Sequence, residues 1–176
     1  MTPRRLIAAA FLGVAACALA ACGGGNLAPS SPGGNGASVS PTSGGFASGA
    51  TSPYCAFVTQ AAVGAALKLP VGKVVTSVQG PATVCAYTGR YEVIVRYQLG
   101  ENTSQFAQDK QSMASLHQTI SNVGGLGDES YIAKYGSGAQ LSYTLATRKG
   151  TLAIFVTSPS SLVAERSLMV QLLSHV

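Results

Sequence analysis

The sequence predicts an α+β domain over residues 54–176, in which helices cover one face of an antiparallel β-sheet. Apolar and polar side chains alternate over residues 91–99, which is the pattern of a strand with one buried face. Segments with helical spacing and capping residues separate the predicted strands. Hairpin-length links join the strands, which favours antiparallel pairing over βαβ crossovers. The predicted order is helix, three strands, helix, three strands, helix.

The first half of the domain is expected to contain one helix and three strands. The helix covers residues 55–69, where alanine is frequent and Pro70 ends the run. Its expected inward face comprises Val58, Ala62, Ala65 and Leu69. The strands are expected at residues 74–78, 83–88 and 91–99, with glycine at the turns between them.

The second half is expected to contain two helices and three further strands. A helix begins at a cap formed by Asn102, Thr103 or Ser104 and runs to about His117. Its apolar stripe comprises Phe106, Met113 and Ile120. A glycine-rich loop follows, and strands are expected at residues 130–133, 139–147 and 151–157. The last helix begins at residues 159–161 and is expected to face inward with Leu162, Val163, Met169, Val170 and Leu173.

The N-terminal segment is expected to address the protein to a membrane. Arg4 and Arg5 precede an apolar run of about a dozen residues, which is too short to remain as a membrane-spanning helix. Leu19-Ala20-Ala21-Cys22 then looks like a bacterial lipobox, in which Cys22 is lipidated and becomes the first residue of the mature chain. At least two acyl chains on one cysteine make membrane attachment lasting. The alternative is an ordinary secretory signal that is cleaved after Ala21.

The chain therefore divides into three parts. Residues 1–21 are predicted to be a cleaved lipoprotein signal peptide, and residues 54–176 to be a single extracytoplasmic domain. Residues 22–53 comprise the lipidated cysteine and a tether, about two-thirds of which is Gly, Ser or Pro, without a charged side chain. Such a composition buries too little apolar surface to fold, so we expect a disordered spacer.

Charge and cysteine content restrict the function classes. Removing the signal peptide lowers the formal net charge from +5 to about +3, which gives no support for nucleic-acid binding. Cys55 and Cys85 are the cysteines that remain in the domain, in a compartment that permits disulfides. We expect them to bond, because a metal site lacks nearby partners and a redox pair usually has Cys-x-x-Cys spacing.

Several landmarks together resemble a known family. They are the lipobox and tether, a cysteine at the start of the first helix, Cys85-Ala86-Tyr87, and the loop Gly-Leu-Gly-Asp-Glu-Ser-Tyr at residues 125–131. This combination resembles actinobacterial lipoproteins with domain of unknown function 3558, a group distantly similar to the sensor domain of a mycobacterial serine/threonine kinase. The resemblance implies an α+β domain with a Cys55–Cys85 bond, and it implies no catalytic residue. The chain departs from the family in having no tryptophan.

Candidate catalytic residues are few. His117 is the only histidine within the domain body, and neither Gly-x-Ser-x-Gly nor His-Glu-x-x-His accompanies it. We expect His117 to lie at the end of a helix, near the negative end of its dipole. The glycines at residues 124–127 lack the Lys-Ser/Thr of a phosphate loop, and Asp128-Glu129 would repel an anion, so a turn is expected. The sequence thus predicts no catalytic, cofactor or metal site.

Tyrosines and basic turns are the remaining candidates for binding. Tyr91, Tyr97 and Tyr143 either cover the sheet or line a groove that binds a lipid, glycan or peptide. Arg90 and the pair Arg148-Lys149 either solubilise hairpin turns or face anionic headgroups or wall polymers.

These observations favour a non-enzymatic binding domain that a lipid holds on the extracytoplasmic side of the cell membrane. Its expected partner is an envelope protein, a glycan or a small ligand. Two alternatives remain: an accessory sensor of an envelope signalling system, and a carrier of a lipid or another apolar ligand. An envelope hydrolase is disfavoured.

Overall fold

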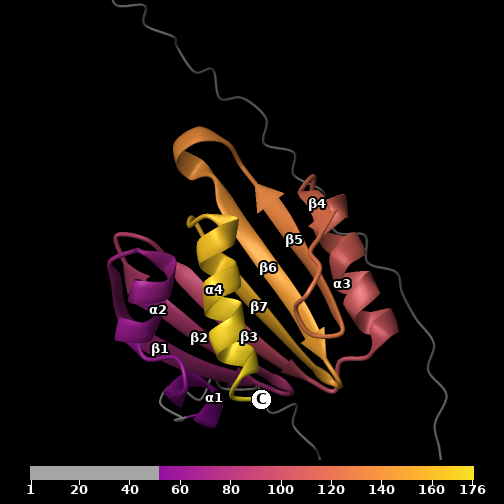
Figure 1. Cartoon of the computed structure of the whole chain (residues 1–176), viewed down its shortest axis with the longest axis horizontal. Coiled ribbons are helices and arrows are strands. Elements are labelled where there is room, and N and C mark those ends of the chain that lie inside the picture. The colour runs from indigo at the N-terminus through magenta and orange to yellow at the C-terminus, as the bar shows by residue number, and fades with distance from the viewer. Residues whose placement is uncertain (1–51) are drawn as a thin grey trace, which may run out of the picture. The chain divides into compact units, whose positions relative to one another are not determined.

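The computed structural model describes residues 52–176, and Figure 1 shows their arrangement. The predicted tether and signal peptide, apart from Ser52 and Pro53, lie outside these residues. The elements in chain order are α1 (Pro53–Ala56), α2 (Gln60–Leu67), β1 (Val71–Gln79), β2 (Ala82–Gly89), β3 (Val93–Leu99), α3 (Thr103–Ser115), β4 (Thr119–Asn122), β5 (Glu129–Tyr135), the 3₁₀ turn η1 (Gly138–Gln140), β6 (Ser142–Lys149), β7 (Leu152–Ser158) and α4 (Leu162–Leu173).

The strands form one seven-stranded sheet in the order β1-β2-β3-β7-β6-β5-β4, and every neighbouring pair is antiparallel. The predicted α+β class and antiparallel sheet are therefore confirmed. β7 comes last in the chain but lies near the middle of the sheet, between β3 and β6 (Figure 1). It joins the β1–β3 meander to the β4–β6 meander.

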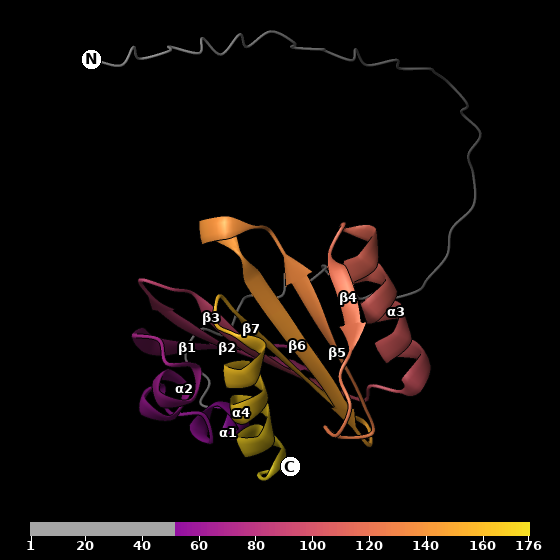
Figure 2. The ribbon, with the colours of Figure 1, turned by 45° about the horizontal axis from the view of Figure 1, so that its top comes forward.

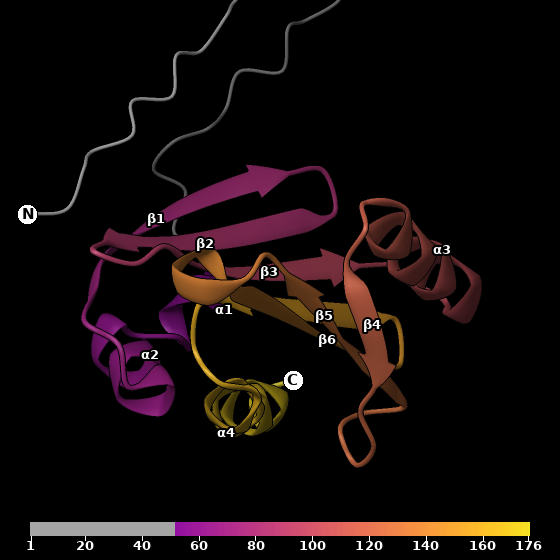
Figure 3. The same cartoon turned by 90° about the horizontal axis from the view of Figure 1, so that it is seen from above.

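The prediction that all helices cover one face of the sheet is wrong. Along β7, Ile154 and Val156 belong to one buried cluster with residues of α2 and α4, whereas Ala153 and Phe155 belong to a second cluster with Phe106 of α3. Successive residues of a strand point to opposite faces, so α3 packs on the face away from α4. Figures 2 and 3 show α2 and α4 on one side of the strands and α3 on the other.

The physical reason for two covered faces is the composition of the central strands. The run from Ala153 to Val156 is apolar at every position and buried on both faces. A strand of this kind needs cover on each side, as in the continuous apolar strands of doubly covered sheets. In β3, by contrast, buried and partly exposed side chains alternate, with Val93, Val95 and Tyr97 buried. The prediction extended this one-sided pattern to the whole sheet.

The first predicted helix is divided in two. α1 ends at Ala56, and α2 begins after Thr59, whose side-chain oxygen accepts a hydrogen bond from the Ala62 amide at 3.2 Å. This N-cap rotates the inward face of α2 relative to the prediction, so that Val63 and Leu67 are buried. Val58 is buried in the link between the two helices, where its carbonyl accepts a hydrogen bond from the Tyr87 hydroxyl.

The second half also differs in detail. β4 was not predicted, and Ile120, expected on the stripe of α3, lies in β4 and packs with Phe106 and Met113. β6 begins at Ser142 rather than at residue 139, because a 3₁₀ turn with a left-handed glycine occupies residues 138–140. Along the chain, four strands therefore lie between α3 and α4, where three were expected.

The inward face of α4 is also corrected. The predicted residues Val163 and Val170 are exposed, and the buried positions are Ala164, Glu165, Leu168, Met169 and Leu172. Ser161 caps the helix by accepting a hydrogen bond from the Ala164 amide, which fixes its start. The observed inward face includes a glutamate, whereas the predicted face contained apolar residues alone.

The predicted disulfide between Cys55 and Cys85 is present, with 5.6 Å between the two Cα atoms. It fastens α1 to β2, where Cys85 is fully buried. The Tyr54 ring stacks on the buried Tyr97 ring with 4.8 Å between centroids. In the chain-entropy account, closing a loop of this length stabilises the fold by about 3.5 kcal/mol. The bond therefore secures the beginning of the domain to the middle of a strand.

Candidate functional site

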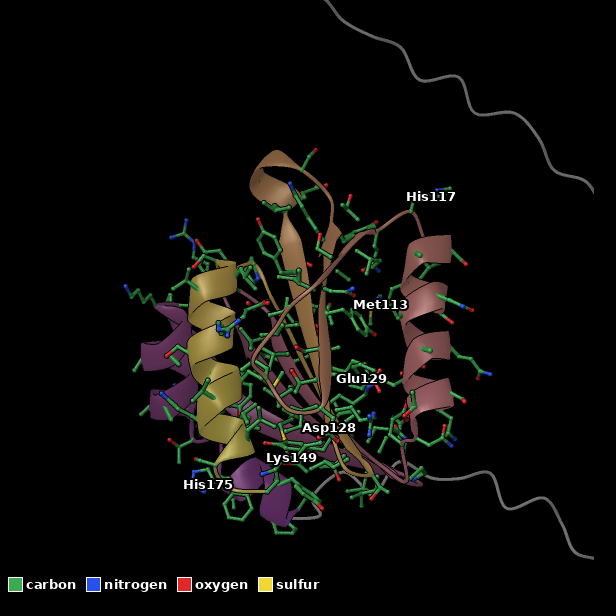
Figure 4. The ribbon with its side chains drawn as sticks, turned by 45° about the vertical axis from the view of Figure 1, so that its right-hand side comes forward. Met113, His117, Asp128, Glu129, Lys149 and His175 are labelled. Carbon is green, nitrogen blue, oxygen red and sulfur yellow. A yellow bond between two sulfur atoms is a disulfide. The ribbon has the colours of Figure 1, made fainter. Side chains whose placement is uncertain are left out.

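The residues singled out from the sequence do not converge on one site. Cys22, the predicted lipidation site, lies outside the described residues. Cys55 and Cys85 are used in the disulfide. Figure 4 shows His117 at one end of α3 and His175 beside the C-terminus, at the other end of the domain. The ring of His175 stacks on that of Phe57 at 5.2 Å.

His117 terminates α3, as predicted from its position. It is exposed and has a left-handed φ of 60°. Its amide donates to the Ala114 carbonyl at 3.0 Å, and the next amide, of Gln118, donates to the Met113 carbonyl at 3.3 Å. These two bonds form a Schellman-type end, in which the left-handed residue is usually glycine. The geometry gives His117 a structural use.

The glycine loop before β5 also has a structural use. A Cβ on Gly127 would lie 2.4 Å from the Arg148 carbonyl oxygen, so only glycine fits this approach. The neighbouring Asp128 amide donates to the same oxygen at 2.8 Å. Leu126 is buried in the main cluster. The loop thus turns the chain from β4 into β5 and packs against the end of β6, in agreement with the turn that we expected.

The basic pair Arg148-Lys149, at the tip of the β6–β7 hairpin, makes contacts within the fold. Arg148 pairs with Asp128 at 3.3 Å and with Glu129 at 2.6 Å, and its side chain is largely buried. Figure 4 shows both acidic residues near the β6–β7 hairpin. Lys149 donates to the main-chain oxygen of Val176 at 2.6 Å. Both side chains at this tip therefore hold the fold together.

The candidate tyrosines differ in their surroundings. Tyr97 is fully buried and covers the sheet, and Tyr143 packs half-buried on the same face as α4. Burial raises the pKa of the Tyr97 hydroxyl far above its ordinary value. Tyr91 is half-buried within the β2–β3 connection, where the Arg90 guanidinium lies 5.5 Å from its ring centroid. Arg90 and Tyr91 are therefore the sequence candidates that lie together at the surface.

These two residues lie at the end of an uncovered part of the sheet. Across neighbouring strands, a row of directly paired residues runs through the face opposite α4: Val75, Ala86, Ile94, Thr157 and Thr144. α3 packs farther along this face, on Tyr131 and Phe155. We call the five paired residues the open strip. Val75 is 54% exposed, and the others are half-buried.

A salt bridge marks the boundary between α3 and the open strip. Arg96 of β3 follows Ile94 on the same face of the strand and bonds to Asp109 of α3 at 3.2 Å. Its guanidinium also lies 4.0 Å from the centroid of the Phe155 ring. Because Arg96 stacks on Phe155 and pairs with Asp109, it separates α3 from the open strip.

A cleft of about 280 Å³ opens at the end of the open strip. Arg90, Tyr91 and Ile94 line it from β3 and the turn before it. Polar groups come from Gln140 in the β5–β6 connection, Ser142 at the start of β6 and Thr157 of β7. A flat aromatic ring beside hydroxyl and amide groups is typical of sites that hold small polar molecules.

Two other clefts have less suitable linings. The seam between α2 and α4, of about 400 Å³, is lined mainly by alanine and serine. The cleft between α3 and β5, of about 330 Å³, contains Lys110 and Glu129, which are engaged with Asn122 and Arg148. The cleft at Arg90 and Tyr91 is therefore the best candidate for a binding site in the described part of the chain.

Neither a metal centre nor a membrane span is found among residues 52–176. They hold no group of three or more His, Cys, Asp or Glu that could bind a metal ion. No helix within this range is both long and apolar enough to cross a membrane.

Sequence reasoning missed one buried polar cluster at the start of α4. The Ser158 hydroxyl donates to Oε1 of Glu165 at 2.7 Å and accepts the Ser160 amide at 3.1 Å. The Ser160 hydroxyl donates to the Leu67 carbonyl at 2.7 Å, which connects the cluster to α2. Oε2 of Glu165 has no hydrogen-bond partner within residues 52–176. Burial raises the pKa of the Glu165 carboxyl to about 8, so the neutral form predominates at neutral pH.

Comparisons with known proteins identify no relative. No protein family, curated protein or solved structure significantly matches the chain.

The Glu165 carboxyl predicts a specific pH dependence of stability. Because its folded pKa is about 8, against an ordinary value of 4.5, the folded protein keeps a proton that the unfolded chain releases between these values. The free energy of unfolding should therefore fall as the pH rises through this window, by up to about 1.4 kcal/mol per pH unit, and then level off. Glu165→Gln should remove this decline, measured by urea denaturation from pH 5 to 9.

Glu92→Gln, at an exposed glutamate, is the control and should retain the wild-type decline. The three proteins differ only at positions 92 and 165, so the comparison isolates the Glu165 carboxyl. Parallel pH profiles for the wild type and Glu165→Gln would contradict the assignment.

Proposed function

We propose that this chain is a lipid-anchored protein of the cell envelope, whose domain binds a ligand on the extracytoplasmic side without performing chemistry. The observation that carries the proposal is Leu19-Ala20-Ala21-Cys22 after two arginines and a short apolar run. A cysteine in this context accepts the diacylglyceryl group of a bacterial lipoprotein, and two or more acyl chains hold it at the membrane. The Gly/Ser/Pro segment that follows serves as a spacer.

The disulfide supports an extracytoplasmic location. Disulfides persist in oxidising compartments and are rare in the cytosol. The Cys55–Cys85 bond crosslinks α1 to β2 within the buried core, as is usual for a structural bond of an exported domain. The disulfide is therefore a second observation in favour of the proposed location.

The proposed ligand surface is the cleft at Arg90 and Tyr91, with the adjoining open strip. Its volume of about 280 Å³ lies near the lower end of small-molecule sites. The Tyr91 ring, Gln140 and Ser142 offer stacking and hydrogen bonds, which suit a sugar or a short peptide. A carrier of long acyl chains receives less support, because this cleft is small and open to solvent.

Cys22→Ser tests the anchor. In cells fed an alkyne-bearing fatty acid, the wild-type protein should become labelled, and mass spectrometry should find Cys22 as a lipid-modified N-terminus. The serine variant should carry no label, because it lacks the thiol that accepts the lipid. Cys17→Ser is the matched control and should label normally, since residue 17 leaves with the signal peptide. A free Cys22 thiol on the mature wild-type protein, or undiminished labelling of Cys22→Ser, would rule out the anchor.

Tyr91→Ala tests the ligand surface. Soluble cell-wall saccharides and muropeptide fragments, added to the isotope-labelled protein, should shift NMR signals of residues 90–94, 139–142 and 157–159. The variant should bind at least about tenfold more weakly, because a stacked aromatic contact is lost. Leu116→Ala removes an exposed apolar side chain elsewhere and should bind normally. Shifts confined to another surface, or equal binding by Tyr91→Ala, would contradict this assignment.

A further inference from the structure

β1 forms one edge of the sheet and pairs only with β2 among residues 52–176. It is nine residues long, and the side chains of Val74, Val75 and Val78 are 37%, 54% and 38% exposed. A long, apolar edge strand presents unpaired backbone donors and acceptors that readily pair with another strand. β1 is therefore a candidate interaction surface, distinct from the Arg90–Tyr91 cleft.

The opposite edge of the sheet is protected. β4 is only four residues long, and α3 packs beside it. The Lys110 ammonium on α3 also donates to the Asn122 side chain at the end of β4. Short length and helical cover are common ways to prevent an edge from pairing. The exposed edge of β1 therefore contrasts with an edge that the same fold closes.

The protective features of β1 are confined to its beginning. Gln60 donates to the Val71 carbonyl at 2.8 Å, and the register with β2 shifts between Val71 and Val74. Lys73, in this irregular part, is the only charged residue of the strand. From Val74 to Gln79 the pairing with β2 is regular and the side chains are uncharged. This regular part is free of the devices that disfavour edge pairing.

The sequence of β1 is self-complementary about Thr76. If two copies pair antiparallel with Thr76 opposite Thr76, Val74 of one lies opposite Val78 of the other. Both valines occupy the face that carries α2 and α4, because they pair with Tyr87 and Thr83 of β2. The two Val74–Val78 pairs then lie on either side of the central Thr76 pair, on the same face of the joined sheet. Aliphatic cross-strand pairs of this kind stabilise sheets.

The charges fit the same register. Lys73 of each copy lies opposite Gln79 of the other, six positions along the strand from the second Lys73. That spacing corresponds to about 20 Å, so the two ammonium groups do not oppose each other. No like charges face each other anywhere between residues 73 and 79.

We propose that β1 docks on β1 of a second copy of this chain, antiparallel and centred on Thr76. The two seven-stranded sheets then form one continuous sheet. The contact is isologous, so each copy uses its exposed edge and assembly ends at a dimer. The second copy is the occupant, because in this register valine lies opposite valine and the two lysines do not oppose each other.

Photocrosslinking of the full-length chain in the cells that produce it tests the proposal. Benzoylphenylalanine at position 75 points away from the face of Cys85 and lies beside Ser77 of the second copy. Irradiation should give a band of twice the monomer mass. Thr76→Lys and Thr76→Glu, each in this background, should reduce the band at least about fivefold, because like charges then face each other. Co-expression of the two variants should restore it through opposite charges.

Thr119→Lys is the matched control, since it places the same charge at an exposed position of the other edge strand and should leave the band unchanged. Formation of the Cys55–Cys85 bond, read by non-reducing mass spectrometry, verifies that each variant has folded. If the protein that carries only the crosslinker at position 75 gives no dimer band, the proposal is overturned. It is also overturned by a crosslink to a different protein instead, by undiminished dimer in Thr76→Lys, or by failure of co-expression to restore the dimer between folded variants.

Discussion

The rest of the structure depends on the burial of β7 on both of its faces. Ala153 to Val156 are almost fully buried, and their side chains alternate between two apolar clusters. Because β7 also lies between β3 and β6, its pairing unites two meanders that are otherwise separate. Neither cluster is complete without this strand. The last strand of the chain is thus the one that closes the core, and this long-range pairing carries a large loop-closure cost.

This constraint explains where the surfaces available for binding lie. One face is covered by α2, α4 and the disulfide-linked α1 over its central strands, and Val74 and Val78 of β1 lie partly exposed beside this cover. On the other face, α3 covers Tyr131 and Phe155, and the Arg96–Asp109 bridge marks the limit of the area that it covers. The open strip and the Arg90–Tyr91 cleft remain beyond that bridge. Two surfaces of different character result: a polar cleft suited to a small ligand, and an apolar edge suited to a second copy.

Local patterns in the sequence predicted most helices and strands, but they did not predict which face of the sheet each helix covers. The alternation of Val93, Val95 and Tyr97 and the pairing of Cys55 with Cys85 were correctly predicted, because each depends on short-range spacing or on simple counting. Periodicity alone does not say which face of the sheet a helix covers, so α3 was misplaced. The predicted inward face of the last helix contained only apolar residues, so the buried Glu165 was not among them, and its partner Ser158 gives no signal in the sequence. For the candidate site, Arg90 and Tyr91 were singled out, but the contributions of Gln140 and Thr157 depend on strand order.

Native-state hydrogen exchange, resolved by residue, tests the central position of β7 most directly. Amides of β7 that pair with β3 and β6 should exchange only through global unfolding, and should share one free energy of opening with their partners. Amides of the short edge strand β4 should exchange through smaller openings. The opposite result would be rapid exchange of β7 while the β1–β3 and β4–β6 meanders remain protected. That pattern would mean that the meanders are stable without β7, and it would contradict the account.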